Sequence, residues 1–323
     1  MKSGKALPDE SGGDMCAASG TSPDWLWETP LVLAATPIGN LADATQRLRM
    51  LIRTAEVIAC EDTRNTRHLI RRLGEQTPAR LVSLHEHNEA SRSAELVEQA
   101  AAGTRILVVS DAGMPGVSDP GLRLVRAAID AGVQVTAAPG ASAVPTALAL
   151  SGLASDRFSF AGFVPRKKSE RTALLDRLRG DAWTTVLFES PHRVAATARE
   201  FAEVLGANRP AAVARELTKK HEEILRGSLG ELADTLAARQ TGSGPTRSGL
   251  KGEFVLVVGG ASTGDGEPGT QKTMGMEAAA DLVIRRAEQG ERLKIVAKEI
   301  AAAHGLNTSE LYDSANRLRS RAR

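Results

Sequence analysis

The chain has 323 residues, of which 42% are apolar and 25% charged, a composition typical of a globular protein with room for more than one domain. Its 41 basic and 39 acidic residues leave a net charge of only +2, so a nucleic-acid partner has to be inferred from local clusters. No apolar run approaches the roughly 18 residues that a membrane helix needs, so no membrane span is expected. The two cysteines, Cys16 and Cys60, give no disulfide framework, and we expect a cytoplasmic protein.

Residues 1–28 are rich in Gly and Ser and lack the apolar core of a signal peptide, so the sequence predicts a disordered N-terminal tail. In residues 29–154, short runs of Val, Ile and Leu alternate with segments of helical length. The predicted strands are Leu31–Ala35, Glu56–Cys60, Arg80–Leu84, Ile106–Ser110 and Val133–Ala137. This alternation predicts an α/β domain whose parallel sheet is covered on both faces and binds ligands at the carboxyl ends of its strands.

Residues 155–260 predict a second α/β domain. Its expected strands are Phe158–Phe163, Thr184–Phe188, Ala211–Arg215 and Glu253–Val258. Residues 261–275 form a predicted linker, although Gly264–Gly269 matches the dinucleotide pattern GxGxxG. We interpret that match as accidental, because the stretch is acidic, contains a proline and lacks a surrounding βαβ unit. Residues 276–323 predict three helices, the last two forming a helix-turn-helix appendage.

Three predicted strands end in turns of proline, glycine and small residues. These turns are Thr36–Leu41, Ser110–Gly121 and Pro139–Ala143. Glycine lets the backbone approach a ligand closely, so together the turns predict a cleft for a flat, partly polar cofactor. The carboxylate of Asp111 is suited to accept hydrogen bonds from a ribose hydroxyl or an ammonium group. Asp119 and Pro120 suit the start of a helix, and Ser142 suits a helix cap that also presents a hydroxyl.

The order and spacing of several motifs resemble the ribosomal RNA small subunit methyltransferase I family. The motifs are Thr36–Leu41, Glu61–Thr66, Leu84–Glu89, Ser110–Gly121, Pro139-Gly140, Gly152–Phe158, Ala214–Lys219 and Lys251–Glu253. The resemblance covers about residues 30–260 and implies a two-domain tetrapyrrole-methylase-like fold with S-adenosyl-L-methionine in the cleft between the domains. It also implies a homodimer that methylates the 2′-oxygen of a cytidine in the decoding region of 16S ribosomal RNA, free or in the assembled small ribosomal subunit.

The resemblance also implies a set of cofactor-binding residues. On the first domain it indicates Asp111, Met114, Ser142 and Ala143, and on the second Phe188, Ala214 and Gly252. The strand-end turns add Pro37, Gly39 and Gly113 to the predicted set. Met114 stands where the family more often has threonine, a departure that we expect to leave the chemistry unchanged.

Two polar clusters follow the second and third predicted strands. Glu61 and Arg64 belong to the first, which is also explained as a salt-bridged helix start capped by Asp62 or Thr63. His87 and Glu89 belong to the second. His85 and His87 suggest a metal pair, but no third ligand is evident, so we predict no metal. The candidate catalytic residues are therefore Glu61, Arg64, His87 and Glu89, with Arg64 for phosphate contact and His87 or Glu89 for proton handling.

Arg166, Lys167 and Lys168 form a basic cluster just after a predicted strand. The alternative explanation is a solvated helix, but the position at the cleft favours contact with an RNA backbone. Two other functions stay open for the chain. One is methylation of a tetrapyrrole-like small molecule on the same fold. The other is that of a transcription factor whose active part is the helix-turn-helix, a function that would leave the three strand-end turns unexplained.

Overall fold

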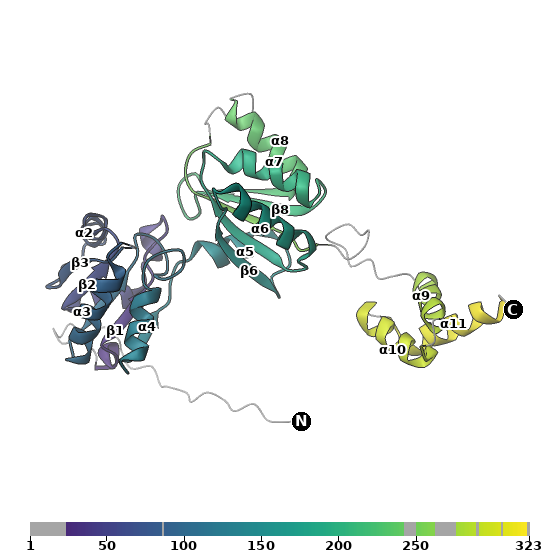
Figure 1. The fold of residues 1–323 in the computed structure, drawn as a ribbon, viewed down its shortest axis with the longest axis horizontal. Helices are drawn as coiled ribbons and strands as arrows, with labels where there is room; N and C mark the ends of the chain where they lie inside the picture. The colour runs from purple at the N-terminus through teal and green to yellow at the C-terminus, as the bar shows by residue number, and fades with distance from the viewer. Residues whose placement is uncertain are drawn as a thin grey trace. The chain divides into compact units, whose positions relative to one another are not determined.

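The computed structural model describes residues 24–85, 87–241, 250–261, 276–288, 291–304 and 306–321. The chain divides into two compact units, residues 1–259 and 260–323 (Figure 1). Two β-sheets with their helices make up the first unit, and three helices make up the second. Within the described ranges, no helix is both long and apolar enough to cross a membrane. Cys16 and all but the first residue of the predicted linker 261–275, including its GxGxxG match, lie outside those ranges.

The first sheet has five parallel strands in the order β3-β2-β4-β1-β5, which confirms the predicted parallel sheet. Its strands are β1 (Leu31–Ala34), β2 (Val57–Cys60), β3 (Arg80–Ser83), β4 (Ile106–Val109) and β5 (Val135–Ala138). Its helices are α1 (Gln46–Thr54), α2 (Thr63–Arg72), α3 (Glu89–Ala101) and α4 (Leu122–Asp130). Apolar residues of α1 and α2 cover one face and those of α3 and α4 cover the other. The central strands are therefore buried on both faces, as their continuous apolar runs predict.

The second sheet has the order β6-β7-β10-β8-β9, and only β6 and β7 are parallel. Its strands are β6 (Phe158–Phe163), β7 (Thr184–Glu189), β8 (Pro210–Arg215), β9 (Glu223–Ser228) and β10 (Phe254–Val258). Helices α6 (Lys168–Gly180), α7 (Val194–Leu205) and α8 (Leu229–Gln240) pack on one face around the fully buried Phe201. In Figure 1, α7 and α8 lie side by side there. The sequence did not predict the edge strand β9.

Helix α5 (Ala143–Ser151) joins the two sheets of the first unit. It follows β5 of the first sheet, yet Val144, Ala147 and Leu148 pack with Val186 and Val255 on the second sheet. The part of the unit built on the first sheet is here called the first lobe, and the part built on the second sheet is called the second lobe. Because α5 packs on the second sheet, the division between the lobes falls before α5, earlier in the chain than the predicted domain boundary after residue 154.

The predicted N-terminal tail, residues 1–28, also extends too far. Asp24–Trp27 forms a short 3-10 helix. Leu26 is buried in the core that α1 shares with the first sheet, and the Trp27 Nε1 donates to Thr54 Oγ1 at 2.8 Å. The folded part of the first lobe thus includes the last residues of the predicted tail, because Leu26 and Trp27 find an apolar surface to cover.

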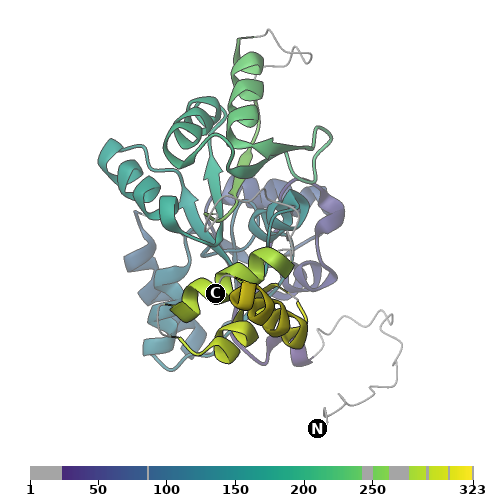
Figure 2. The ribbon, with the colours of Figure 1, turned by 90° about the vertical axis from the view of Figure 1, so that its right-hand side faces the viewer.

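The second unit consists of α9 (Met276–Glu288), α10 (Leu293–His304) and α11 (Thr308–Arg321) (Figure 2). Val296, Ile300, Leu311 and Ala315 lie in its core. The Oδ1 of Asn307 accepts a hydrogen bond from the backbone of Ser309 at 2.9 Å and so caps α11. The three predicted helices are confirmed, and α10 and α11 form the expected helix pair.

We predict that Leu26→Ala lowers the free energy of unfolding by about 2–5 kcal/mol, because it leaves a cavity in a packed core. Glu28→Ala is the matched control, since Glu28 is exposed, and it should change the free energy by less than about 0.5 kcal/mol. Urea titration measures both variants. Equal effects of the two substitutions would show that residues 24–28 do not belong to the folded lobe.

Candidate functional site

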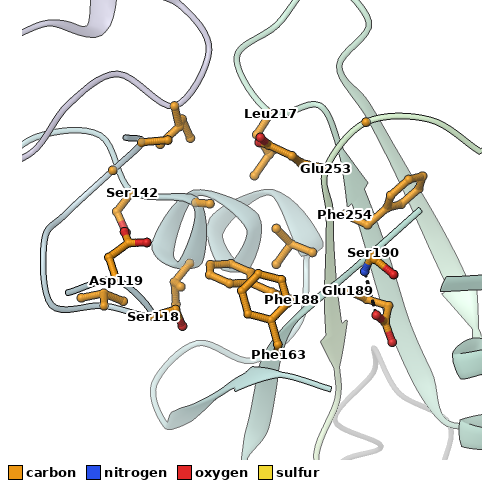
Figure 3. Close-up of a pocket in the computed structure, with 18 of the residues that line it drawn as sticks. Ser118, Asp119, Ser142, Phe163, Phe188, Glu189, Ser190, Leu217, Glu253 and Phe254 are labelled. Atoms are coloured by element: carbon orange, nitrogen blue, oxygen red, sulfur yellow. Dashed lines mark hydrogen bonds between the residues drawn. The ribbon is translucent and has the colours of Figure 1, made fainter. Parts of the chain in front are cut away.

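A cavity of about 400 Å³ lies in the first unit, between the strand ends of the first sheet and the second lobe (Figure 3). The turns after β1, β4 and β5 supply one side of it, and the ends of β6 and β7 with the start of β10 supply the other. Ser118, Asp119 and Ser142 lie together on the first side in Figure 3. The cavity lies at the carboxyl ends of the parallel strands, where the sequence predicts a ligand site.

Six of the ten predicted cofactor residues line this cavity. They are Gly113, Met114, Ser142, Ala143, Phe188 and Gly252. Ala214 is buried in the apolar core of the second lobe and does not line it. Pro37, Gly39 and Asp111 line a neighbouring cavity of about 270 Å³ instead. The ligand contacts of all ten residues stay predictions.

Backbone hydrogen bonds hold the turns after β1 and β4 together. Thr36 and Gly113 exchange two of them, at 2.9 and 3.1 Å. The Ser110 hydroxyl donates to the Gly113 carbonyl at 3.0 Å. These contacts fix the glycine backbone at the wall of the cavity, where no side chain of its own separates it from a ligand.

The structure corrects the predicted roles of Asp119 and Glu89. Helix α4 begins at Leu122 after Gly121, rather than at Asp119 and Pro120. Glu89 caps this helix, because its Oε1 accepts hydrogen bonds from the backbone N–H groups of Gly121 and Arg123 at 2.8 and 3.0 Å. The Glu89 side chain is buried and occupied as a cap, which leaves it unsuited to proton handling. Asp119 does not cap α4 and instead lines the cavity.

Carboxylates gather on the side of the site formed by the first sheet. Burial raises the pKa of Asp119 to about 6, and the charges of Glu61 and Asp111 add to the effect. Burial, followed by the charges of Asp111 and Asp62, also raises the pKa of Glu61. Like charges held close together disfavour ionisation. These three carboxylates, Glu61, Asp111 and Asp119, are here called the acidic wall. Only Asp119 of the three lines the cavity, and together they are suited to a positively charged ligand.

Aromatic rings form the opposite part of the site. The ring of Phe188 meets those of Phe160 and Phe163 edge to face, with centroids 4.9 and 5.3 Å apart. Phe163 is 61% exposed although it is large and apolar, and it lines the cavity together with Phe188 (Figure 3). An exposed aromatic ring at a cavity offers a stacking surface for a flat ligand.

Arg64 and His87 lie outside the cavity. Arg64 is exposed and paired with Asp62, whose Oδ2 lies 2.6 Å from the Arg64 Nη2. Asp62 also accepts from the Arg64 backbone N–H at 2.8 Å and caps α2, which confirms the alternative interpretation of that cluster. His87 is exposed beside His85, with the ring centroids 6.1 Å apart. Among the described residues, no group of three or more His, Cys, Asp or Glu is arranged to hold a metal ion.

Several lining residues were missing from the predicted set. They include Ile38, Asp119, Phe163, Leu217 and Glu253. Phe163 and Glu253 stand at the ends of predicted strands, so their positions carried a usable signal. Asp119 was hidden by its resemblance to a helix start. Leu217 belongs to a turn whose conformation no local pattern predicts.

Comparison with known proteins defines the class of this chain. The family model of the tetrapyrrole (corrin/porphyrin) methylases matches residues 30–233, so the fold is that of this class of methylase. Diphthine synthase, a solved structure, shares the fold with a TM-score of 0.51 and 17% identity over 71% of this chain and 89% of its own.

Two relatives narrow the class. Ribosomal RNA small subunit methyltransferase I of Mycobacterium bovis is 45% identical over 289 residues, 88% of this chain and 93% of the relative. Its counterpart in Micromonospora olivasterospora is 41% identical over 304 residues, 94% of this chain and 92% of the relative. The chain belongs to the ribosomal RNA small subunit methyltransferase I family, which confirms the resemblance drawn from its motifs.

We predict that the free energy of unfolding falls as the pH rises from about 4 to about 7, measured relative to Asp119→Asn. Because the folded-state pKa of Asp119 is raised from 3.8 to about 6, the folded chain holds the proton more tightly than the unfolded chain. The associated stability is present below the unfolded pKa and is lost as the pH rises through the folded pKa. Urea titrations across this range measure the difference, and a difference independent of pH would contradict the assignment.

Proposed function

We propose that this chain transfers the methyl group of S-adenosylmethionine to the ribose 2′-oxygen of a cytidine in the decoding region of 16S ribosomal RNA. Family membership supports methylation of small-subunit ribosomal RNA, and the acceptor atom and nucleotide are our inference from the resemblance. The observation that carries the proposal is the cavity of about 400 Å³, with the rings of Phe163 and Phe188 on one side and the carboxylate of Asp119 on the other.

The residues around the cavity fit S-adenosylmethionine. Its adenine is flat, and Phe163 and Phe188 offer ring surfaces beside which it can lie. Its sulfonium and ammonium groups are positive, and the acidic wall favours positive charge. When bound, the cofactor supplies a methyl group that is already electrophilic. The chain's own tasks are to position the acceptor oxygen, to exclude water and to receive a proton.

Asp119 is the residue best placed to receive that proton. It lines the cavity, and its pKa of about 6 leaves the carboxylate ionised near neutral pH while keeping it a useful base. Glu61, a predicted candidate, raises the pKa of Asp119 through its charge. We therefore propose Asp119 as the proton acceptor and Glu61 as a residue that tunes it.

The basic cluster at the start of α6 supports an RNA substrate. Arg166, Lys167 and Lys168 are all exposed, and Lys168 is the first residue of the helix. Cations are disfavoured at a helix N-terminus by the helix dipole, so the cluster does not serve the stability of α6. Exposed backbone N–H groups and basic side chains together suit a phosphate. Because Phe163 lines the cavity three residues earlier, RNA bound here would lie beside the cofactor site.

A tetrapyrrole-like small molecule is the alternative substrate, since the matching family model describes tetrapyrrole methylases. That substrate gives no role to the basic cluster at α6. Methylation of small-subunit RNA without methylation of tetrapyrroles would show that RNA is the substrate.

We predict that the purified protein binds S-adenosylmethionine in excess chelator with unchanged affinity. The cavity offers aromatic and carboxylate groups that account for binding without a metal ion. Titration calorimetry with and without chelator measures this. Loss of binding on chelation would contradict the prediction.

We predict that Arg166→Glu combined with Lys168→Glu weakens RNA affinity by orders of magnitude and reduces its salt dependence, because phosphate contacts are lost. Cofactor affinity should stay within twofold. Lys167 is left in place because its Nζ pairs with Glu170 Oε1 at 3.3 Å.

The matched control is Arg177→Glu with Arg179→Glu, which makes the same charge change at the far end of α6, where both side chains are exposed. This control should weaken RNA binding far less. Removal of residues 276–323 should also have a smaller effect on methylation. The RNA surface is wrongly assigned if the α6 reversal leaves methylation intact while that removal abolishes it.

A further inference from the structure

Two further spaces lie near the cofactor cavity in the first unit. The first, here called the inner chamber, has a volume of about 270 Å³ and shares Ile38, Ala112 and Glu253 with the cofactor cavity. The second, here called the outer groove, shares Gly39, Leu41, Arg72 and Lys219 with the inner chamber. The three spaces are therefore adjacent, each sharing lining residues with the next.

The outer groove carries only positive charge. Its lining residues are Gly39, Asn40, Leu41, Arg72, Thr218, Lys219 and Lys220. Arg72 comes from the last turn of α2, and the two lysines come from the turn between β8 and β9. Arg72 and Lys220 are exposed, and neither forms an ion pair with any residue that the structure describes. Their charges are thus available to an anionic ligand.

The inner chamber shares Arg72 and Lys219 with the outer groove and adds polar groups of a different kind. The Asn65 side-chain amide donates to Asp111 Oδ2 at 2.6 Å, and Asp111, Asn65 and His68 all line the chamber. An amide, a carboxylate and an imidazole offer both hydrogen-bond donors and acceptors. Such a set suits the hydroxyl and ring-edge groups of a nucleoside better than it suits a phosphate.

The turn that bears the lysines is strained and firmly held. Glu216 and Thr218 have positive φ angles of 51° and 65°, which are uncommon for residues other than glycine. The Lys219 Nζ contacts Glu216 Oε1 at 2.9 Å and Glu253 Oε2 at 3.1 Å, which occupies two of its three donors. Strain of this kind gathers at functional sites, where the surrounding structure maintains it. Here it keeps Lys219 at the boundary of the chamber and the groove.

We propose that the outer groove and the inner chamber together bind the RNA strand that carries the target nucleotide, an inference that rests on the proposed function. Phosphates of the strand contact Arg72, Lys219 and Lys220 in the outer groove. The target nucleoside enters the inner chamber, and its ribose reaches the cofactor cavity beside Ile38, Ala112 and Glu253. The target nucleoside and the cofactor thus approach the point of transfer from two different spaces.

Arg72→Glu and Arg71→Glu provide a matched test. Both residues are exposed in the last turn of α2, so both reversals change the net charge and the helix terminus alike. Only Arg72 lines the outer groove. We expect Arg72→Glu to weaken affinity for small-subunit RNA about tenfold or more and to reduce the slope of log affinity against log salt by about one. Arg71→Glu should weaken it less than threefold. Both variants should bind the cofactor as tightly as the unaltered chain, which shows that they are folded.

Asn65→Ala tests the inner chamber separately. We expect it to lower the rate of methyl transfer at saturating RNA while RNA affinity is retained, because the strand still binds but the nucleoside is poorly placed. Equal effects of the two arginine reversals would contradict the assignment of the outer groove as the phosphate-binding surface. An unchanged rate in Asn65→Ala would contradict the assignment of the inner chamber as the nucleoside site. Failure of the unaltered chain to methylate ribosomal RNA would instead contradict the proposed function.

Discussion

The close approach of two turns from different sheets is the constraint on which the site depends. A side chain at Gly39, after β1, would bring its Cβ within 2.9 Å of Thr218 Oγ1 and 3.1 Å of the Leu217 carbonyl, after β8. With glycine there, the Asn40 N–H donates to Thr218 Oγ1 at 3.1 Å. This contact holds the first lobe against the second, and Lys219 is fixed beside it by Glu216 and Glu253. The cofactor cavity, the inner chamber and the outer groove all take their walls from both lobes, so their shapes follow from this contact.

The same arrangement separates charges that the net charge of +2 conceals. Glu61, Asp111 and Asp119 lie at the strand ends of the first sheet, where burial and then the charges of neighbouring carboxylates raise the pKa values of Glu61 and Asp119. The cations Arg72, Lys219 and Lys220 lie at the outer groove. Asp119 favours a cationic cofactor in the cofactor cavity, and the cations of the outer groove favour the phosphates of the target strand. Electrostatic attraction can therefore order both reactants without a strongly basic protein.

The sequence predicts the first sheet well, because each central strand is a continuous apolar run buried on both faces. It fails at β9, an edge strand whose half-buried residues show no clear alternation. Local sequence patterns also give the wrong helix cap where the capping residue comes from a distant part of the chain. Asp119 resembles a helix cap, but Glu89 reaches α4 from another segment and caps it instead. The packing of α5 on the second sheet is likewise invisible in sequence. The motif resemblance indicates the class of cofactor. The inner chamber and the outer groove are formed by residues far apart in the sequence, so only the three-dimensional structure reveals them.

The central claim is that the site transfers a methyl group to a ribose oxygen of small-subunit RNA. The most direct measurement incubates the purified protein and labelled S-adenosylmethionine with small ribosomal subunits from cells that lack the enzyme, and with the free RNA. Digestion to nucleosides and mass spectrometry then locate the label. The account predicts 2′-O-methylcytidine at a single position in the decoding region. Label on a nucleobase, or none in either substrate, would contradict it.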